Sequence, residues 1–68
     1  MSVNLSEIFK SRRKKLCIKQ TDLAELSGVS LPTVKDIERG VGNPSFSTIL
    51  RLFEVLGLEI DVHLRKTE

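Results

Sequence analysis

The feature that most constrains the fold of this chain is the segment 20–40, which reads QTDLAELSGVSLPTVKDIERG. Its first part predicts a short helix from about Gln20 to Ser27, which Gly28 ends because the left-handed conformation that closes a helix suits glycine. Ser30 can then cap a second helix by accepting a hydrogen bond from an amide of the following turn. Val34 and Ile37, three residues apart, would point inward from that helix. The segment therefore predicts two short helices that cross at a steep angle over a tight turn.

This segment resembles the helix-turn-helix of the phage repressor and Cro family of DNA-binding proteins, also called the XRE family. The likeness covers residues 5–57, with the motif itself at about 20–39. Small, glycine, apolar and capping residues match at fixed spacing, at Gln20, Leu23-Ala24, Gly28-Val29-Ser30, Val34 and Ile37-Glu38-Arg39-Gly40. A generic helical hairpin in a small bundle is the alternative interpretation.

Helices are also expected on both sides of this motif. Asn4 can cap a first helix that would end near Leu16, with an apolar stripe facing the core. After a loop at 40–44, Ser45 can cap a fourth helix, which Gly57 would end. The fourth helix is expected to form one wall of the core through Phe46, Ile49, Leu50, Phe53 and Leu56.

The C-terminal residues 58–65, LEIDVHLR, strictly alternate apolar and polar side chains, which is the pattern of a strand. A lone strand leaves backbone groups unpaired on both edges, and the sequence predicts no second strand. We therefore expect antiparallel pairing with the same strand of a second copy about a two-fold axis, a plan that resembles HipB-like antitoxins. The expected dimer contacts are Leu58, Ile60, Val62 and Leu64. A frayed tail or a short fifth helix is the alternative.

The predicted fold class is thus an all-α, four-helix repressor-like domain over residues 1–57, followed by a dimerisation strand and tail over 58–68. A single cysteine, Cys17, excludes an intrachain disulfide and fits a cytoplasmic location. Cys17 stands where many relatives have glycine, so we expect a slightly strained turn with a half-buried side chain. No apolar run approaches the roughly 20 residues that a membrane span needs, and no signal-peptide pattern occurs.

The resemblance places the helix at 31–39 in the major groove of DNA. The face opposite Val34 and Ile37 carries the expected base-facing residues, which are Leu31, Pro32, Lys35 and Asp36. Lys35 can donate to guanine and Asp36 can accept from cytosine, whereas the two apolar residues can pack only on a thymine methyl group.

The resemblance also implies contacts to DNA phosphates. The residues expected to make them are Gln20, Thr33, Arg39, Asn43 and Ser45. For Gln20, Thr33 and Asn43, a helix-start or turn-forming role is the alternative. In the family a glutamate of the second motif helix pairs with an arginine of the first helix, and the matching residues are Glu38 and Arg13. We expect this pair to be structural, with a phosphate contact as an additional role for Arg13.

Charge is distributed unevenly along the chain. Residues 1–40 contain eight Lys or Arg and five Asp or Glu, a net +3, whereas residues 41–68 contain three and four, a net −1. The basic end includes Arg12-Arg13-Lys14-Lys15 and Lys19. Such a run forms either a solvated helix face or a surface that contacts phosphates.

Catalytic chemistry is not expected. The chain has one His, one Cys and no Tyr or Trp, and it shows no metal-ligand spacing, phosphate-cradling glycine loop or nucleophile elbow. We therefore expect no enzyme activity, no cofactor and no metal. The expected function is sequence-specific binding of a homodimer to double-stranded DNA at an inverted-repeat operator, as a transcriptional repressor. Two alternatives remain: an antitoxin that also binds a toxin kinase, or an interaction module that has lost DNA binding.

Overall fold

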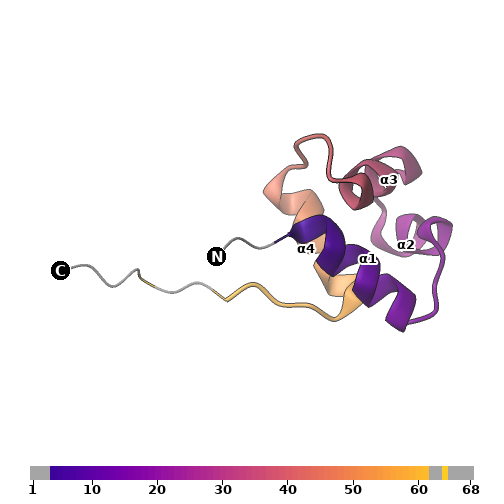
Figure 1. Cartoon of the computed structure of the whole chain (residues 1–68), viewed down its shortest axis with the longest axis horizontal. Coiled ribbons are helices and arrows are strands. Elements are labelled where there is room, and N and C mark those ends of the chain that lie inside the picture. Colours follow the sequence, from indigo (N-terminus) through magenta and orange to yellow (C-terminus); the bar gives the residue numbers. More distant parts are fainter. Residues whose placement is uncertain (1–3, 62–63, 65–68) are drawn as a thin grey trace.

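The computed structural model describes residues 4–61 and residue 64. Within them the chain forms four helices, α1 (Leu5–Lys15), α2 (Gln20–Ser27), α3 (Leu31–Arg39) and α4 (Phe46–Leu56), arranged as Figure 1 shows. The predicted all-α, four-helix domain is confirmed, and the predicted bounds of α2 and α3 match those observed. Both α3 and α4 pack on the pair formed by α1 and α2.

The core joins all four helices. The rings of Phe9 in α1 and Phe53 in α4 meet edge to face, with centroids 5.4 Å apart and planes at 65°. The buried apolar side chains are Phe9, Leu23, Val29, Val34, Ile37, Leu52, Phe53 and Leu56. Because the turn residue Val29 belongs to this cluster, the core fixes the angle between α2 and α3 as well as the positions of the helices.

Side-chain caps set where three of the helices begin. The Ser30 hydroxyl accepts a hydrogen bond from the Thr33 amide at 3.4 Å, and the Ser45 hydroxyl accepts one from the Thr48 amide at 3.2 Å. The side-chain oxygen of Asn4 accepts one from the amide of the first turn of α1. Each bond satisfies an amide that has no partner within its helix. The three predicted caps are confirmed.

The turn after α1 is closed by a left-handed residue that is not glycine. Cys17 has φ 60°, whereas glycines occupy the equivalent positions after the other helices. Its amide donates to the Lys14 carbonyl and the Ile18 amide donates to the Arg13 carbonyl, which is the Schellman pattern. The predicted strain is confirmed, but the predicted half-buried position is wrong. Cys17 is exposed, and its thiol lies 3.9 Å from the carbonyl oxygen of Lys15, the last residue of α1.

The apolar stripe predicted for α4 is partly wrong. Phe46 and Leu50 are 63% and 43% exposed, whereas Leu52, which lies outside the predicted stripe, is completely buried. The helix packs against α1 and α2 together, so its buried arc is centred between Leu52 and Phe53 at about 100° per residue. Phe46 and Leu50 then fall at the edge of that arc, on the outer side of the molecule.

The predicted C-terminal strand is only partly covered by the structure. Residues 58–61 and Leu64 have no strand conformation in the isolated chain, and Val62 and His63 lie outside the described residues. Leu58 packs against the core, and Ile60 and Leu64 are exposed. A strand that pairs only with a second copy has no partner in one chain, so the intersubunit sheet stays a prediction.

The strained turn at Cys17 generates the first prediction. A left-handed conformation costs a residue with a β-carbon roughly 1–2 kcal/mol, and replacement by glycine removes this cost. Glycine also gives the unfolded chain more conformational freedom, which lowers the free energy of unfolding by roughly 0.4–1 kcal/mol. Cys17→Gly should therefore stabilise the fold by about 0.5–1 kcal/mol in urea unfolding. Cys17→Ala keeps the β-carbon and serves as the control. Equal stabilisation by both changes would assign the effect to the thiol and contradict the backbone explanation.

Candidate nucleic-acid interface

One face of α3 is exposed and slightly hollowed. The hollow has a volume of about 280 Å³ and is lined by Leu31, Pro32, Lys35, Asp36 and Arg39. The structure therefore brings all four residues predicted to face the bases onto one continuous surface, together with Arg39. Val34 and Ile37, on the opposite side of the helix, are buried in the core.

The two ends of α3 are fixed by local sequence. Pro32 lies in the first turn, where its missing amide removes no helical hydrogen bond. Gly40 ends the helix with φ 77°, and the Val41 amide donates to the Asp36 carbonyl at 2.9 Å. A short helix closed at both ends holds the side chains of its exposed face on a rigid support.

Two charged residues of this face form an ion pair that was not predicted. The Arg39 Nη2 atom lies 3.1 Å from the Asp36 Oδ1 atom. The residues are three positions apart, a spacing at which opposite charges meet on a helix surface. That spacing is the signal in the sequence from which the pair could have been found.

The residues predicted to contact phosphates lie at separate places. Thr33 and Asn43 line a second hollow, of about 180 Å³, between α3 and the loop to α4. The Thr33 hydroxyl lies 2.8 Å from that of Ser30, and the Ser45 hydroxyl lies 2.9 Å from that of Thr48. Thr33 and Ser45 thus take part in helix starts, which for Thr33 is the alternative role that the sequence offers. Asn43 is exposed in the loop.

The expected partners Arg13 and Glu38 are in contact. Arg13 donates from Nε to Glu38 Oε2 at 2.6 Å and from Nη2 to Glu38 Oε1 at 2.9 Å, and its Nη1 donates to the Ile18 carbonyl. Glu38 is only 3% exposed. Gln20 also takes part, because its Nε2 donates to Glu38 Oε1 at 3.1 Å. One carboxylate therefore links α1, the start of α2 and the end of α3.

This network shifts the protonation of both charged partners. Burial raises the pKa of the Glu38 carboxyl, but hydrogen bonds from Arg13 and Gln20, with the charges of Arg13 and Lys10, outweigh burial and bring the pKa below its ordinary value. The hydrogen bond to Glu38 is the main cause that raises the pKa of the Arg13 guanidinium. The ionised pair is therefore the form that the fold stabilises.

The basic residues at the end of α1 and in the turn to α2 form two groups. Arg12 donates from Nε to the Leu56 carbonyl at 2.7 Å and so completes the end of α4, while Arg13 holds Glu38. The remaining three cations, Lys14, Lys15 and Lys19, are exposed. Of these five basic residues, only the three exposed lysines remain as candidates for a surface that contacts phosphates. No local pattern signals the contact of Arg12, which spans 44 residues of sequence.

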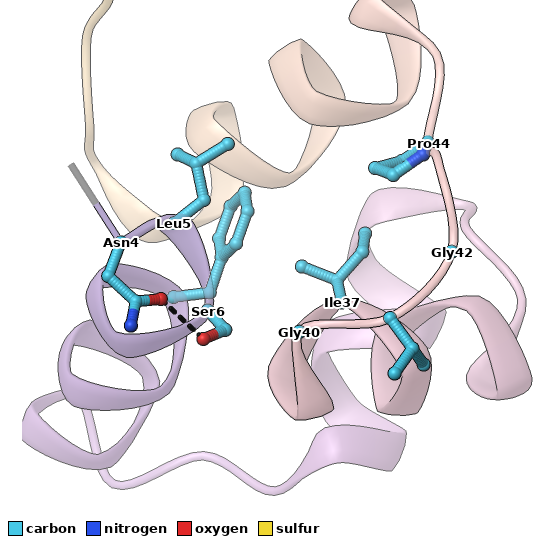
Figure 2. Close-up of a pocket in the computed structure, with 9 residues that line it drawn as sticks. Asn4, Leu5, Ser6, Ile37, Gly40, Gly42 and Pro44 are labelled. Carbon is cyan, nitrogen blue, oxygen red and sulfur yellow. Dashed lines mark hydrogen bonds between the residues drawn. The ribbon is translucent and has the colours of Figure 1, made fainter. Parts of the chain in front are cut away.

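A larger hollow, of about 370 Å³, lies elsewhere in the molecule. It separates the start of α1 from the loop after α3, as Figure 2 shows, and Leu5 and Pro44 lie on its opposite sides. None of the residues predicted to contact DNA lines it. Over the described residues, no group of three or more His, Cys, Asp or Glu is arranged to hold a metal ion. In the same part of the chain, no helix has the length and apolar character required to cross a membrane.

Comparisons with known proteins agree with this geometry. A family model described as helix-turn-helix matches residues 9–63. The chain is 36% identical over 64 residues to the ImmF control region 10 kDa protein of Bacillus phage phi105, a match that covers 94% of this chain and 70% of that protein. It is 38% identical over 58 residues to an uncharacterized HTH-type transcriptional regulator of Haemophilus influenzae, covering 85% of this chain and 58% of the relative.

The buried network generates the second prediction. Glu38→Gln and Arg13→Met should each cost roughly 3 kcal/mol in chemical unfolding at low temperature, because each leaves a charge or polar group without its partner. The double variant should cost less than the sum of the two single changes. Strictly additive losses would contradict the contact.

The same pair sets a dependence on pH. Since folding lowers the pKa of Glu38 from its ordinary value of 4.5, the ionised pair stabilises the fold above that pH and ceases to do so as pH falls through the folded pKa. The difference in unfolding free energy between wild type and Glu38→Gln should therefore narrow below pH 4.5. A constant difference from neutral to acid pH would show that the charge of Glu38 is not what the fold requires.

Proposed function

The chain belongs to the helix-turn-helix family, of the XRE type, and on that premise we propose that it regulates transcription by binding double-stranded DNA through the exposed face of α3. The observation that carries the proposal is that face itself, where the four predicted base-facing residues and Arg39 line one hollow surface. The major groove admits an α-helix, and its base pairs each display a distinct pattern of donors, acceptors and methyl groups.

Three side chains of this face supply direct recognition in our proposal. Lys35 is exposed and carries donors suited to guanine O6 and N7. Leu31 and Pro32 have no side-chain donors or acceptors, so they contribute packing against thymine methyl groups. We therefore propose a half-site that combines guanine with thymine.

Phosphate contacts would fix the helix in the groove. The Gln20 amide nitrogen has two hydrogens, and the one given to Glu38 orients the side chain and leaves the other for a phosphate oxygen. We propose the same role for Asn43 in its loop and for the hydroxyl groups of Thr33 and Ser45. In this arrangement the network that joins the helices also positions a DNA-contacting side chain.

A second copy of the chain is the partner that we propose for the outer side of α1 and α4. Phe9 meets Phe53 and Arg12 meets Leu56, so the two helices run side by side with an offset of 44 residues. Leu5 lies one turn before Phe9 in α1, so the same offset places it beside the beginning of α4. Phe46 and Leu50 are exposed in that part of α4. Apolar side chains that gather on the outside of a small domain are typical of an interaction surface.

Dimerisation through this surface and the segment 58–64 would determine the form of the DNA site. Two copies related by a two-fold axis would present their α3 helices to half-sites about one turn of DNA apart, roughly 34 Å. The operator would then be an inverted repeat. Repression is the form of regulation that we propose, since one relative is a control-region protein of a phage.

The third prediction tests recognition by α3. Lys35→Ala should lower affinity for the best site by about 1–3 kcal/mol and relax the preference at one base pair, because Lys35 reads a base. Arg51→Ala, which removes the same charge from the exposed side of α4, is the control and should alter neither. Affinities of both variants and wild type are measured by fluorescence anisotropy on a selected duplex and on random duplexes at several salt concentrations.

For the wild type, the logarithm of the binding constant should fall with the logarithm of salt concentration at several units of slope, roughly 0.9 per phosphate neutralised. Absence of binding to any duplex at low salt would contradict the proposed function. Equal losses for Lys35→Ala on selected and random DNA would show instead that Lys35 contacts the backbone.

The fourth prediction concerns the dimer. Leu50→Asp, or truncation after Gly57, should give a monomer at micromolar concentration, because the first change buries a charge in the interface and the second removes the pairing segment. Leu26→Asp makes the same exchange at an exposed leucine of α2 and should leave the dimer intact. Sedimentation velocity distinguishes the two sizes. A wild-type monomer, or a dimer that survives both changes, would contradict this interface.

A further inference from the structure

The ion pair between Asp36 and Arg39 on α3 indicates that the two residues have different roles in recognition. We infer that Asp36 is a positioning residue that holds Arg39 across the base-facing side of α3, and that Arg39 reads a guanine from there. The inference rests on the proposed DNA binding and deepens it. It also exchanges the roles that the sequence predicts, in which Asp36 reads a base and Arg39 contacts a phosphate.

The Arg39 side chain lies along the exposed face of α3. Arg39 is the last residue of α3, and side chains on a helix lean toward its N-terminus. Its Nη2 donates to Asp36, one turn earlier, at 3.1 Å. Arg39 consequently lines the same hollow as Leu31, Pro32 and Lys35. The guanidinium group lies over the surface that faces the bases and does not extend beyond the end of the helix.

The chemistry of the Arg39 guanidinium and the Asp36 carboxylate also fits these roles. A guanidinium group has five N–H donors, so the bond to Asp36 leaves enough of them for the paired acceptors of guanine, O6 and N7. Contact with Arg39 neutralises the Asp36 carboxylate, which on its own would be repelled by the phosphates on either side of the groove. A flexible arginine that is already held in place also loses less freedom when it binds.

The exposure of the pair separates this role from a structural one. The side chains of Arg39 and Asp36 are 69% and 49% exposed. Ion pairs this open to water add little to stability, so changes to either residue should leave the fold unaltered. Any effect on the choice of DNA sequence then reports directly on recognition.

The test is selection of duplexes from a random pool, followed by sequencing, for wild type and variants whose melting temperatures are first shown to agree. Asp36→Ala and Arg39→Ala should each lose the preference for guanine at the same base pair, by at least about fivefold. The double variant should lose no more than either single change. Asp36→Glu keeps a carboxylate within reach of Arg39 and should retain the preference. Glu54→Ala, at an exposed carboxylate of α4, controls for the change in net charge.

Two results would overturn the inference while leaving DNA binding in place. If Asp36→Ala and Arg39→Ala alter different base pairs, Asp36 reads a base of its own. If Arg39→Ala weakens all duplexes equally and keeps every preference, Arg39 is a phosphate contact. A wild type that selects no duplex at low salt would overturn the proposed function together with the inference, a result distinct from the other two.

Discussion

The structure depends on one buried carboxylate. Glu38 accepts hydrogen bonds from Nε and Nη2 of Arg13 and from the Gln20 amide, and it is almost completely shielded from water. These contacts join the first helix, the first motif helix and the recognition helix at a single point. A buried charge without partners is costly, so the carboxylate imposes one arrangement of the three helices. We regard this constraint as the reason that so thin a core can fix the angle of α3.

The same carboxylate connects the interior with the proposed DNA surface. Glu38 lies on the inner side of α3, whereas Lys35, Asp36 and Arg39 lie on its exposed side, so a shift of α3 would move all three together. Gln20 extends the connection to the start of α2. We therefore propose that the same hydrogen bonds position both the helix packing and the DNA-contacting side chains, and that the flexible end of Lys35 supplies the local adjustment.

Local signals predicted most of this architecture. Asn4, Ser30 and Ser45 cap helices because a side-chain oxygen satisfies a free amide, and such chemistry is readable from neighbouring residues. Burial depends on how helices pack, so the sequence pattern predicts Phe46 and Leu50 in the core and gives no sign that Leu52 is buried. The contact of Arg12 with Leu56 joins residues far apart in sequence and leaves no local trace.

The candidate site divides in the same way. The exposed face of α3 could be predicted because helical periodicity places Leu31, Pro32, Lys35 and Asp36 opposite Val34 and Ile37. The involvement of Gln20 with Glu38 was not predicted, since it depends on the packing of α2 against α3. The pairing that we propose for the segment 58–64 would depend on a second chain, and neither a single sequence nor a single copy determines it.

Chemical protection of bound DNA shows directly whether α3 occupies the major groove. Dimethyl sulfate methylates guanine at N7 in the major groove and adenine at N3 in the minor groove, so one experiment reports on both grooves of a duplex selected by the wild type. Recognition by two α3 helices should protect guanine N7 in two half-sites about one helical turn apart and leave adenine N3 reactive there. Guanines that stay fully reactive on a saturated duplex, or protection confined to adenine N3, would contradict recognition by α3 in the major groove.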